Sequence, residues 1–254
     1  MIEITKHIST TMNATALEFS DETYDYKTLT LEEFLVQNTP SGWKKFFSLP
    51  TVKKIIPVLS EALKESGEKE TIYPSMDNIF RALYETGEDA VSVVILGQDP
   101  YHNGSAVGLA FSVPDGATLN PSMVNIKKEV VNCGYEIKAK SGNLFSWARQ
   151  GVLLINTALT VKKGEEESHL KIWNEFTKEF IKYITKEKED LVFILWGNKA
   201  KLYKKYFTKE HLVVETSHPS PLSASKGFLG SECFMEANGH LLSLGKDEID
   251  WSVL

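Results

Sequence analysis

The chain has 254 residues, of which 42% are apolar and 24% are charged. These are ordinary values for a globular protein with a sizeable core, and they exclude a disordered or fibrous chain. The 34 acidic residues outnumber the 28 basic ones, and this net charge of −6 argues against a protein that coats nucleic acid. Because only two of the basic residues are arginines, a sequence-specific reader of the major groove is also not expected.

The N-terminus and the cysteines predict an intracellular protein. The first ten residues, MIEITKHIST, lack the apolar stretch of a signal peptide, and the acidic residues that follow argue against a transit peptide. The longest apolar runs are far shorter than the ~20 residues of a membrane span. Cys133 and Cys233 are isolated, which excludes a disulfide framework or a cysteine-based zinc cluster. We expect the cytoplasm of a bacterium, or a nucleus or viral replication site, and not secretion.

The chain contains no internal repeat, low-complexity tract or linker. Residues 1–40 are weakly patterned, and we expect them to form an N-terminal arm. From Ser41, apolar residues at helical spacing in WKKFF and VKKIIPVLSEALKES predict helices. We expect one folded domain over residues 41–254.

Four short apolar runs follow, each rich in Val, Ile and Leu, as is typical of strands buried on both faces. They are VSVVILG at 91–97, VLLIN at 152–156, LVFILWG at 191–197 and HLVVETS at 211–217. Amphipathic stretches predict helices at 122–132, 143–150, 172–188 and 198–206. This alternation predicts a single α/β domain with a central parallel sheet flanked by helices on both faces.

Polar or turn-forming residues follow every predicted strand. The exits read GQDPYHNGSAVGLAF, Asn156-Thr157, Gly197-Asn198 and HPSPLSASKGF. Since ligands of open α/β sheets bind beyond the carboxyl ends of the strands, the sequence predicts a functional site at this edge.

Two of these exits carry groups capable of chemistry. Proline after Asp99 keeps that residue extended, and the long connector that follows is typical of a functional loop. Taken alone, QDPYH is equally compatible with a capped turn after a strand. In HPSPLS at 218–223, two prolines stiffen a loop that can hold His218 at the strand end and present Leu222 outward. The alternative for this segment is a surface turn with a chance histidine and an apolar tip.

Four motifs together resemble the family-1 uracil-DNA glycosylases, over roughly residues 40–245 and in the same order. They are GQDPYH at 97–102, GLAFSV at 108–113, GVLLINTALTV at 151–161 and HPSPLS at 218–223. The resemblance implies a four-stranded parallel sheet flanked by helices. It also implies an enzyme of base-excision repair that flips uracil out of DNA and hydrolyses its N-glycosidic bond, leaving an abasic site.

The resemblance implies two catalytic residues. Asp99 would position or activate water and stabilise the cationic sugar, and a neutral His218 would donate to uracil O2 as charge develops on the leaving base. Because uracil leaves as a delocalised anion, a second carboxylic acid of the kind used by other glycosidases is not required. His102 is expected to support the turn at Asp99, and the Ser168-His169 pair is assigned a structural role.

The resemblance also implies a pocket for the base. Asn156 would pair with uracil N3–H and O4, and Phe111 would stack on the ring. Tyr101 would fill the space beside C5, where thymine carries a methyl group, and Gln98 would contribute its backbone amide. Cytosine presents the reverse donor and acceptor pattern to Asn156 and would leave buried polar groups unpaired.

The DNA strand would be held by short loops whose hydroxyls and amides contact phosphates without reading sequence. Leu222 would enter the base stack as a wedge. The chain departs from the family in keeping one proline in TLNPS at 118–122 and in ending its third strand with Gly-Asn, where the family usually has Gly-Ser. The implied DNA contacts are Pro121, Ser122, Gly197, Asn198, Ser220, Leu222 and Ser223.

We expect a monomer that needs no cofactor or metal and does not bind membranes. Its expected partners are uracil-containing single- and double-stranded DNA and proteinaceous inhibitors that mimic DNA. The alternative is a non-catalytic DNA-binding or replication-accessory protein of the same fold, but Asp99 and His218 are both present. An enzyme acting on free nucleotides or a zinc deaminase would need a phosphate-binding loop or a zinc motif, and the sequence has neither.

Overall fold

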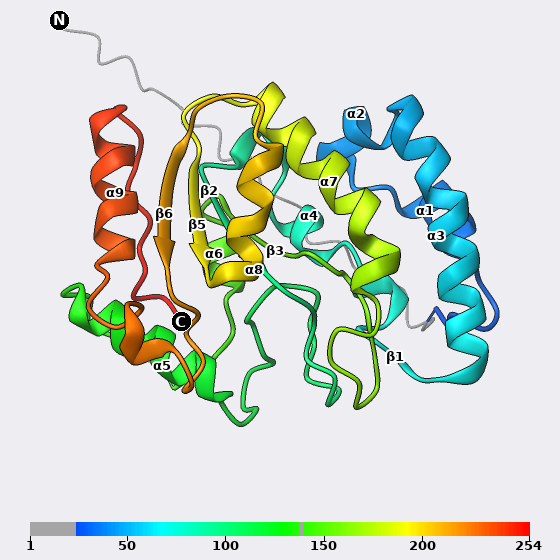
Figure 1. Ribbon diagram of the computed structural model, residues 1–254, viewed down its shortest axis with the longest axis horizontal. Helices are drawn as coiled ribbons and strands as arrows, with labels where there is room; N and C mark the ends of the chain where they lie inside the picture. The colour runs from blue at the N-terminus through cyan, green and yellow to red at the C-terminus, as the bar shows by residue number, and fades with distance from the viewer. Residues whose placement is uncertain (1–23, 138–139) are drawn as a thin grey trace, which may run out of the picture.

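The computed structural model describes residues 24–137 and 140–254, and a parallel sheet lies at its centre (Figure 1). The strands are β2 (Val93–Gly97), β3 (Val152–Asn156), β5 (Val192–Trp196) and β6 (Leu212–Thr216), in the order β3-β2-β5-β6. All neighbouring pairs are parallel, and the register places Gly97 beside Asn156. The predicted α/β fold is confirmed, and each strand lies within its predicted range.

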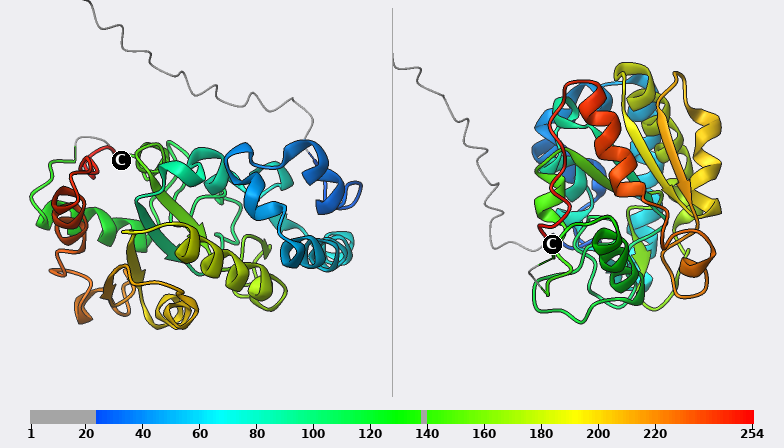
Figure 2. Two further views of the ribbon diagram at one scale, coloured as in Figure 1. Left: turned by 90° about the horizontal axis from the view of Figure 1, so that it is seen from above. Right: turned by 90° about the vertical axis from the view of Figure 1, so that its left-hand side faces the viewer.

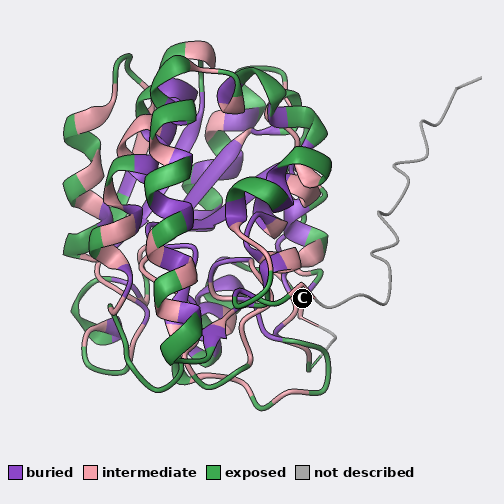
Figure 3. Ribbon diagram, turned by 90° about the vertical axis from the view of Figure 1, so that its right-hand side faces the viewer, coloured by how far each residue is buried: buried purple, intermediate pink, exposed green. Residues whose placement is uncertain are grey.

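The strands are apolar because both faces of the sheet are covered. Every residue of β2, β3 and β5 is buried, whereas β6 lies at the edge and is partly exposed. Successive side chains point to opposite faces, so Val94 and Leu96 belong to one core while Val93 and Ile95 belong to the other. Figure 3 shows these buried strands enclosed by helices with exposed outer surfaces.

Helices cover both faces of the sheet (Figures 1 and 2). The larger core includes residues of α1 (Leu31–Asn38), α2 (Lys44–Phe47), α3 (Pro50–Lys69), α4 (Arg81–Glu85), α7 (Leu170–Glu187) and α8 (Asn198–Lys201). The other core includes residues of α5 (Pro121–Asn132), α6 (Phe145–Ala148) and α9 (Cys233–Ser243). Helix α7 shows why these helices pack against the sheet, because its buried Trp173, Phe176 and Phe180 form one apolar face at helical spacing.

Among the described residues, no helix is long and apolar enough to cross a membrane.

Local structure differs from the prediction at three points. The predicted helix 143–150 is helical only over α6, and the predicted helix 198–206 is α8 followed by a 3-10 helix over Leu202–Tyr206. A second, antiparallel sheet pairs β1 (Ile72–Tyr73) with β4 (Val161–Lys162). Two-residue strands are too short to show the alternation from which strands are predicted.

Part of the expected N-terminal arm is packed into the domain. Tyr26, Leu31 and Phe34 are buried in the larger core, and the Tyr26 hydroxyl donates to the carbonyl oxygen of Pro74 at 2.7 Å. Helix α1 begins with a capping box, in which Thr30 and Glu33 bond to each other's backbone N–H groups. The expected boundary at residue 40 therefore lies inside the packed structure, and residues 1–23 lie outside the described residues.

Candidate active site

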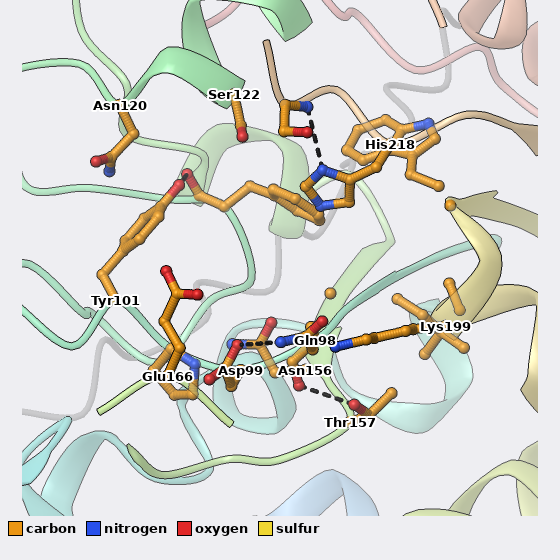
Figure 4. Close-up of a pocket in the computed structure, with 18 of the residues that line it drawn as sticks. Gln98, Asp99, Tyr101, Asn120, Ser122, Asn156, Thr157, Glu166, Lys199 and His218 are labelled. Atoms are coloured by element: carbon orange, nitrogen blue, oxygen red, sulfur yellow. Dashed lines mark hydrogen bonds between the residues drawn. The ribbon is translucent and has the colours of Figure 1, made fainter. Parts of the chain in front are cut away.

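A pocket of about 600 Å³ lies at the carboxyl edge of the sheet, where residues from the exits of all four strands meet (Figure 4). In Figure 1 the strands point toward this edge, and the N-terminal end of α5 lies there too. Most of the sequence-predicted residues line the pocket, namely Gln98, Asp99, Tyr101, Phe111, Pro121, Ser122, Asn156, Gly197, Asn198, His218, Ser220 and Leu222. Ser223 does not line it, but its hydroxyl donates to the carbonyl oxygen of His218 at 2.8 Å.

Asp99 follows β2 and is held by two hydrogen bonds. Its Oδ2 accepts from the backbone N–H of Glu167 at 2.6 Å, and its Oδ1 accepts from the Gln98 side-chain amide at 3.1 Å. Burial raises the pKa of Asp99 above its ordinary value, the two hydrogen bonds oppose this, and the nearby Glu166 and Glu167 carboxylates add to the rise. The site therefore contains an oriented, partly desolvated carboxylate.

His218 follows β6, and its contacts define its tautomer. Its Nδ1 accepts from the backbone N–H of Ser220 at 3.1 Å, so a neutral imidazole carries its proton on Nε2. Burial lowers the pKa of His218, and the Lys199 ammonium lowers it further. Gly197 allows this placement, because it has a φ of 87° and an added Cβ would lie 2.9 Å from the Cβ of His218. The arrangement provides a neutral hydrogen-bond donor.

Asn156 ends β3 and is 7% exposed. Its amide packs directly over Gly97 of the neighbouring strand, where an added Cβ would lie 2.1 Å from the Asn156 Oδ1. The adjacent loops are joined as well, since the Thr157 hydroxyl donates to the carbonyl oxygen of Gln98 at 2.8 Å. Sequence reasoning did not assign a role to Gly97 or Thr157. The signal for Gly97 was its place opposite Asn156, which appears only once the strand register is known.

Tyr101 and Phe111 form the wall next to Asn120. The Tyr101 hydroxyl donates to the carbonyl oxygen of Phe111 at 3.0 Å, and burial raises the pKa of Tyr101 to about 12. Phe111 adopts a left-handed φ of 66°, and its ring lies 5.0 Å from that of Trp196 and 6.0 Å from that of His218, centre to centre. The two rings form an apolar wall, in which the hydrogen bond positions Tyr101 and the neighbouring rings position Phe111.

The loop after β6 is tied to itself and to α5. The Ser217 hydroxyl donates to the carbonyl oxygen of Ser223 at 2.7 Å, and the side-chain amide of Asn125, on α5, donates to the carbonyl oxygen of Pro219 at 2.8 Å. Leu222, at the tip, remains 85% exposed. A fixed loop thus presents an apolar side chain beside the first turn of α5, which contains Pro121 and Ser122.

Two further histidines and one ion pair differ in how far they match the expectation. The His102 Nε2 lies 3.5 Å from a Glu166 carboxylate oxygen, and no described hydrogen bond joins its ring to the Asp99 turn. His169 is buried outside the pocket, between hydroxyls of Ser66 and Thr160, as expected of a structural residue. Glu167 and Lys199, which pair with each other at the mouth of the pocket, were not predicted.

Comparisons with known proteins agree on one family. A model described as the Uracil DNA glycosylase superfamily matches residues 84–242. A uracil-DNA glycosylase from Clostridium beijerinckii is 46% identical over 217 residues, which cover 84% of this chain and 96% of that protein. One from Anoxybacillus flavithermus is also 46% identical, over 77% of this chain and 88% of that protein.

Solved structures agree with these matches. The crystal structure of mimivirus uracil-DNA glycosylase superposes with a TM-score of 0.83 at 31% identity, covering 89% of this chain and 90% of that one. A variant of the mimivirus protein, solved in complex with UGI, also gives a TM-score of 0.83, at 30% identity, over 89% of this chain and 92% of that one.

Proposed function

The chain belongs to the Uracil DNA glycosylase superfamily, and from this premise we propose how its own residues perform the reaction. The protein is a uracil-DNA glycosylase, a hydrolase of N-glycosidic bonds that removes uracil from DNA in repair. The observation that carries the assignment of residues is that Asp99, Asn156 and His218 come from three different strand exits and line one pocket. No two of them are close in sequence, so the fold itself assembles the set.

Asp99 and His218 act on opposite ends of the breaking bond. As the bond lengthens, the sugar becomes cationic and the base anionic. The Asp99 carboxylate stabilises the cation and orients the attacking water, and its two hydrogen bonds hold it in place without reorganisation. The His218 Nε2–H donates to uracil O2, which carries charge mainly in the transition state. A neutral histidine suffices because the departing base is a stable anion.

Uracil is recognised by a fixed amide and a steric wall. The buried Asn156 presents one carbonyl and one NH₂ group, which match uracil N3–H and O4. The Tyr101 ring stands beside C5 and leaves no space for the methyl group of thymine, while Phe111 stacks on the base. The hydrogen bond between Tyr101 and Phe111 fixes the positions of both residues in the pocket.

DNA approaches the face around the pocket mouth. Ser122, Asn198, Ser220 and the backbone of Gly197 contact phosphates, and Leu222 enters the stack vacated by the flipped nucleotide. We propose that one monomer acts on single- and double-stranded DNA inside the cell. A proteinaceous inhibitor would bind this same face, a view supported by the mimivirus protein in complex with UGI.

Replacing Asn156 with aspartate tests the recognition model. We expect Asn156→Asp to lose uracil release by at least tenfold and to gain slow release of cytosine, because a protonated carboxyl donates to cytosine N3 and accepts from its amino group. The gain should grow as pH falls and the carboxyl becomes neutral. The measurement is release of each base from matched oligonucleotides between pH 5 and 8. A folded variant that releases no cytosine at any pH would contradict the pairing.

A further inference from the structure

Lys199 lies at the mouth of the pocket, immediately after the Gly197-Asn198 exit of β5. Its Nζ forms an ion pair with a carboxylate oxygen of Glu167, which precedes α7. The two side chains remain 55% and 47% exposed. In Figure 4, the Lys199 side chain extends across the mouth toward Gln98.

Glu167 also contacts the catalytic carboxylate through its backbone. Its N–H donates to Asp99 Oδ2 at 2.6 Å, and its Oε1 accepts from the Gln98 amide at 3.2 Å as well as from Lys199. The φ of Glu167 is 64°, in the left-handed region, which is uncommon for a residue other than glycine. Of these contacts, only the ion pair with Lys199 requires the negative charge of the side chain, which also raises the pKa of Asp99.

The pair lies where the proposed function places a DNA phosphate. Lys199 lines the pocket with Asn198 and Ser220, and both are proposed phosphate contacts. The Glu166 carboxylate lines the same pocket, so acidic side chains adjoin Lys199 there. An exposed ion pair adds little net stability, whereas a lysine that neutralises a phosphate also releases counterions from the DNA. Exchange of the carboxylate for a phosphate is therefore energetically accessible.

We propose that Glu167 is an intramolecular stand-in for a DNA phosphate, and that Lys199 exchanges its carboxylate for a backbone phosphate when DNA binds. The proposal rests on the DNA-binding face described above. It assigns Lys199 as a phosphate contact and Glu167 as its competitor. It also means that the DNA strand contacts Lys199 only after the lysine is released from Glu167.

Glu167→Gln isolates the charge. The glutamine keeps an oxygen for Gln98 and the backbone N–H for Asp99, and it removes the attraction to Lys199 together with the repulsion of the Asp99 carboxylate. Binding is measured by fluorescence anisotropy over a salt series. The probe is an oligonucleotide duplex whose single deoxyuridine carries a 2′-fluorine, which opposes the cationic sugar and blocks hydrolysis. We expect Glu167→Gln to tighten binding three- to tenfold at low salt.

Lys199→Met supplies the second arm. It should weaken binding and reduce the slope of log K against log salt by about 0.9, the value for one phosphate contact. In the double variant, most of the gain from Glu167→Gln should disappear. Glu165→Gln is the matched control, because it also removes one negative charge, two residues before Glu167. The Glu165 carboxylate faces Lys162, whose Nζ lies 3.8 Å away, and not Lys199. Glu165→Gln should change binding less than twofold.

Several results would overturn the exchange. If Glu167→Gln tightens binding equally with and without Lys199, or if Glu165→Gln gives the same gain, the effect is general repulsion between the rim and DNA. If neither Glu167→Gln nor Lys199→Met changes binding or its salt slope, the ion pair persists on DNA. Uracil release from an ordinary substrate is measured for the wild type in parallel, because its absence would contradict the proposed function instead of the exchange.

Discussion

Asn156 can lie where it does because Gly97 has no side chain. The strand register sets the two residues side by side, and the Asn156 amide occupies the space where a Cβ would project. The Ala110 Cβ would lie 2.9 Å from the same added atom, so the glycine position is closed from two directions. In the proposed recognition of uracil, base specificity therefore depends on Gly97, a residue that does not itself contact the base.

Gly97→Ala should displace the Asn156 amide and reduce uracil release about 100-fold, equivalent to about 2.7 kcal/mol of transition-state stabilisation. Gly87→Ala is the matched control, because an added Cβ there meets no atom within 4 Å. Single-turnover uracil release and thermal unfolding are measured for both variants. Normal release by Gly97→Ala would show that the Asn156 position is not restricted by its neighbour.

Some of the site residues could be assigned from the sequence and others could not, for physical reasons. Asp99 and His218 each follow an apolar strand directly, so strand placement alone brings them to one edge. Glu167 reaches Asp99 only because the segment between β4 and α7 folds back over the exit of β2. The ion pair of Lys199 could not be predicted either, because its partner is Glu167. Contacts between loops distant in sequence leave no periodic pattern, so single-sequence reasoning cannot find them.

At the scale of the elements, hydrogen bonds fix the backbone of the loop after β6, which carries Leu222 at its tip. Hydrogen bonds among Ser217, Ser220 and Ser223, and the bond from Asn125 to Pro219, hold the loop independently of the leucine side chain. The Glu129 carboxylate, also on α5, accepts from the backbone N–H of Gly230 at 2.6 Å and fixes the segment that follows. Truncating Leu222 should therefore leave the conformation of the loop unchanged.

Leu222→Ala should lower uracil release from duplex DNA about tenfold relative to single-stranded DNA, equivalent to about 1.4 kcal/mol. Stacking and pairing oppose extrusion far more in the duplex than in a single strand, so we expect the wedge to matter mainly in the duplex. Uracil opposite guanine should be affected less than uracil opposite adenine, since a mismatch opens more easily. Val36→Ala, which truncates a residue 81% exposed on α1, is the control. Equal losses on both DNA forms would mean that Leu222 supports the pocket and does not act as a wedge.

The start of α7 contains a buried histidine that couples the fold to pH. His169 is 3% exposed and lies between the Thr160 hydroxyl at 2.8 Å and the Ser66 hydroxyl of α3 at 2.9 Å. Burial lowers the pKa of His169 to about 4, assisted by Lys162. The folded state therefore favours the neutral ring. The stability this provides is complete above the unfolded pKa of about 6.5 and is lost as pH falls toward 4.

The free energy of unfolding should fall by up to about 3 kcal/mol between pH 7 and pH 4 from this residue alone. His169→Gln should be less stable at pH 7, by about 1–2 kcal/mol, but should lose less stability on acidification. Urea unfolding at a series of pH values measures both effects, with the more exposed His102→Gln as the control. If wild type and His169→Gln lose stability in parallel, the buried ring is not the source of the acid sensitivity.

At the scale of the whole molecule, the proposed DNA contacts of this acidic protein are concentrated at one edge of the sheet. The net charge is −6, yet the face around the pocket combines backbone amides, serine hydroxyls and Lys199. The four strands and their flanking helices were predictable, because a strand buried on both sides must be apolar along its length, but the order β3-β2-β5-β6 was not predicted. The packing of residues 24–40 was missed, although Leu31 and Phe34 stand at helical spacing and Thr30 with Glu33 matches a capping box.

The most direct test of the account is single-turnover uracil release by Asp99→Asn beside the wild type, with DNA affinity measured on the same preparations. Asparagine has nearly the same shape, still accepts from the Glu167 N–H and removes the charge opposite the cationic sugar. We expect release to fall 100- to 1,000-fold, about 2.7–4 kcal/mol, with DNA affinity within twofold of the wild type. Near-normal release by a folded Asp99→Asn variant would contradict the assignment of Asp99 as the catalytic carboxylate.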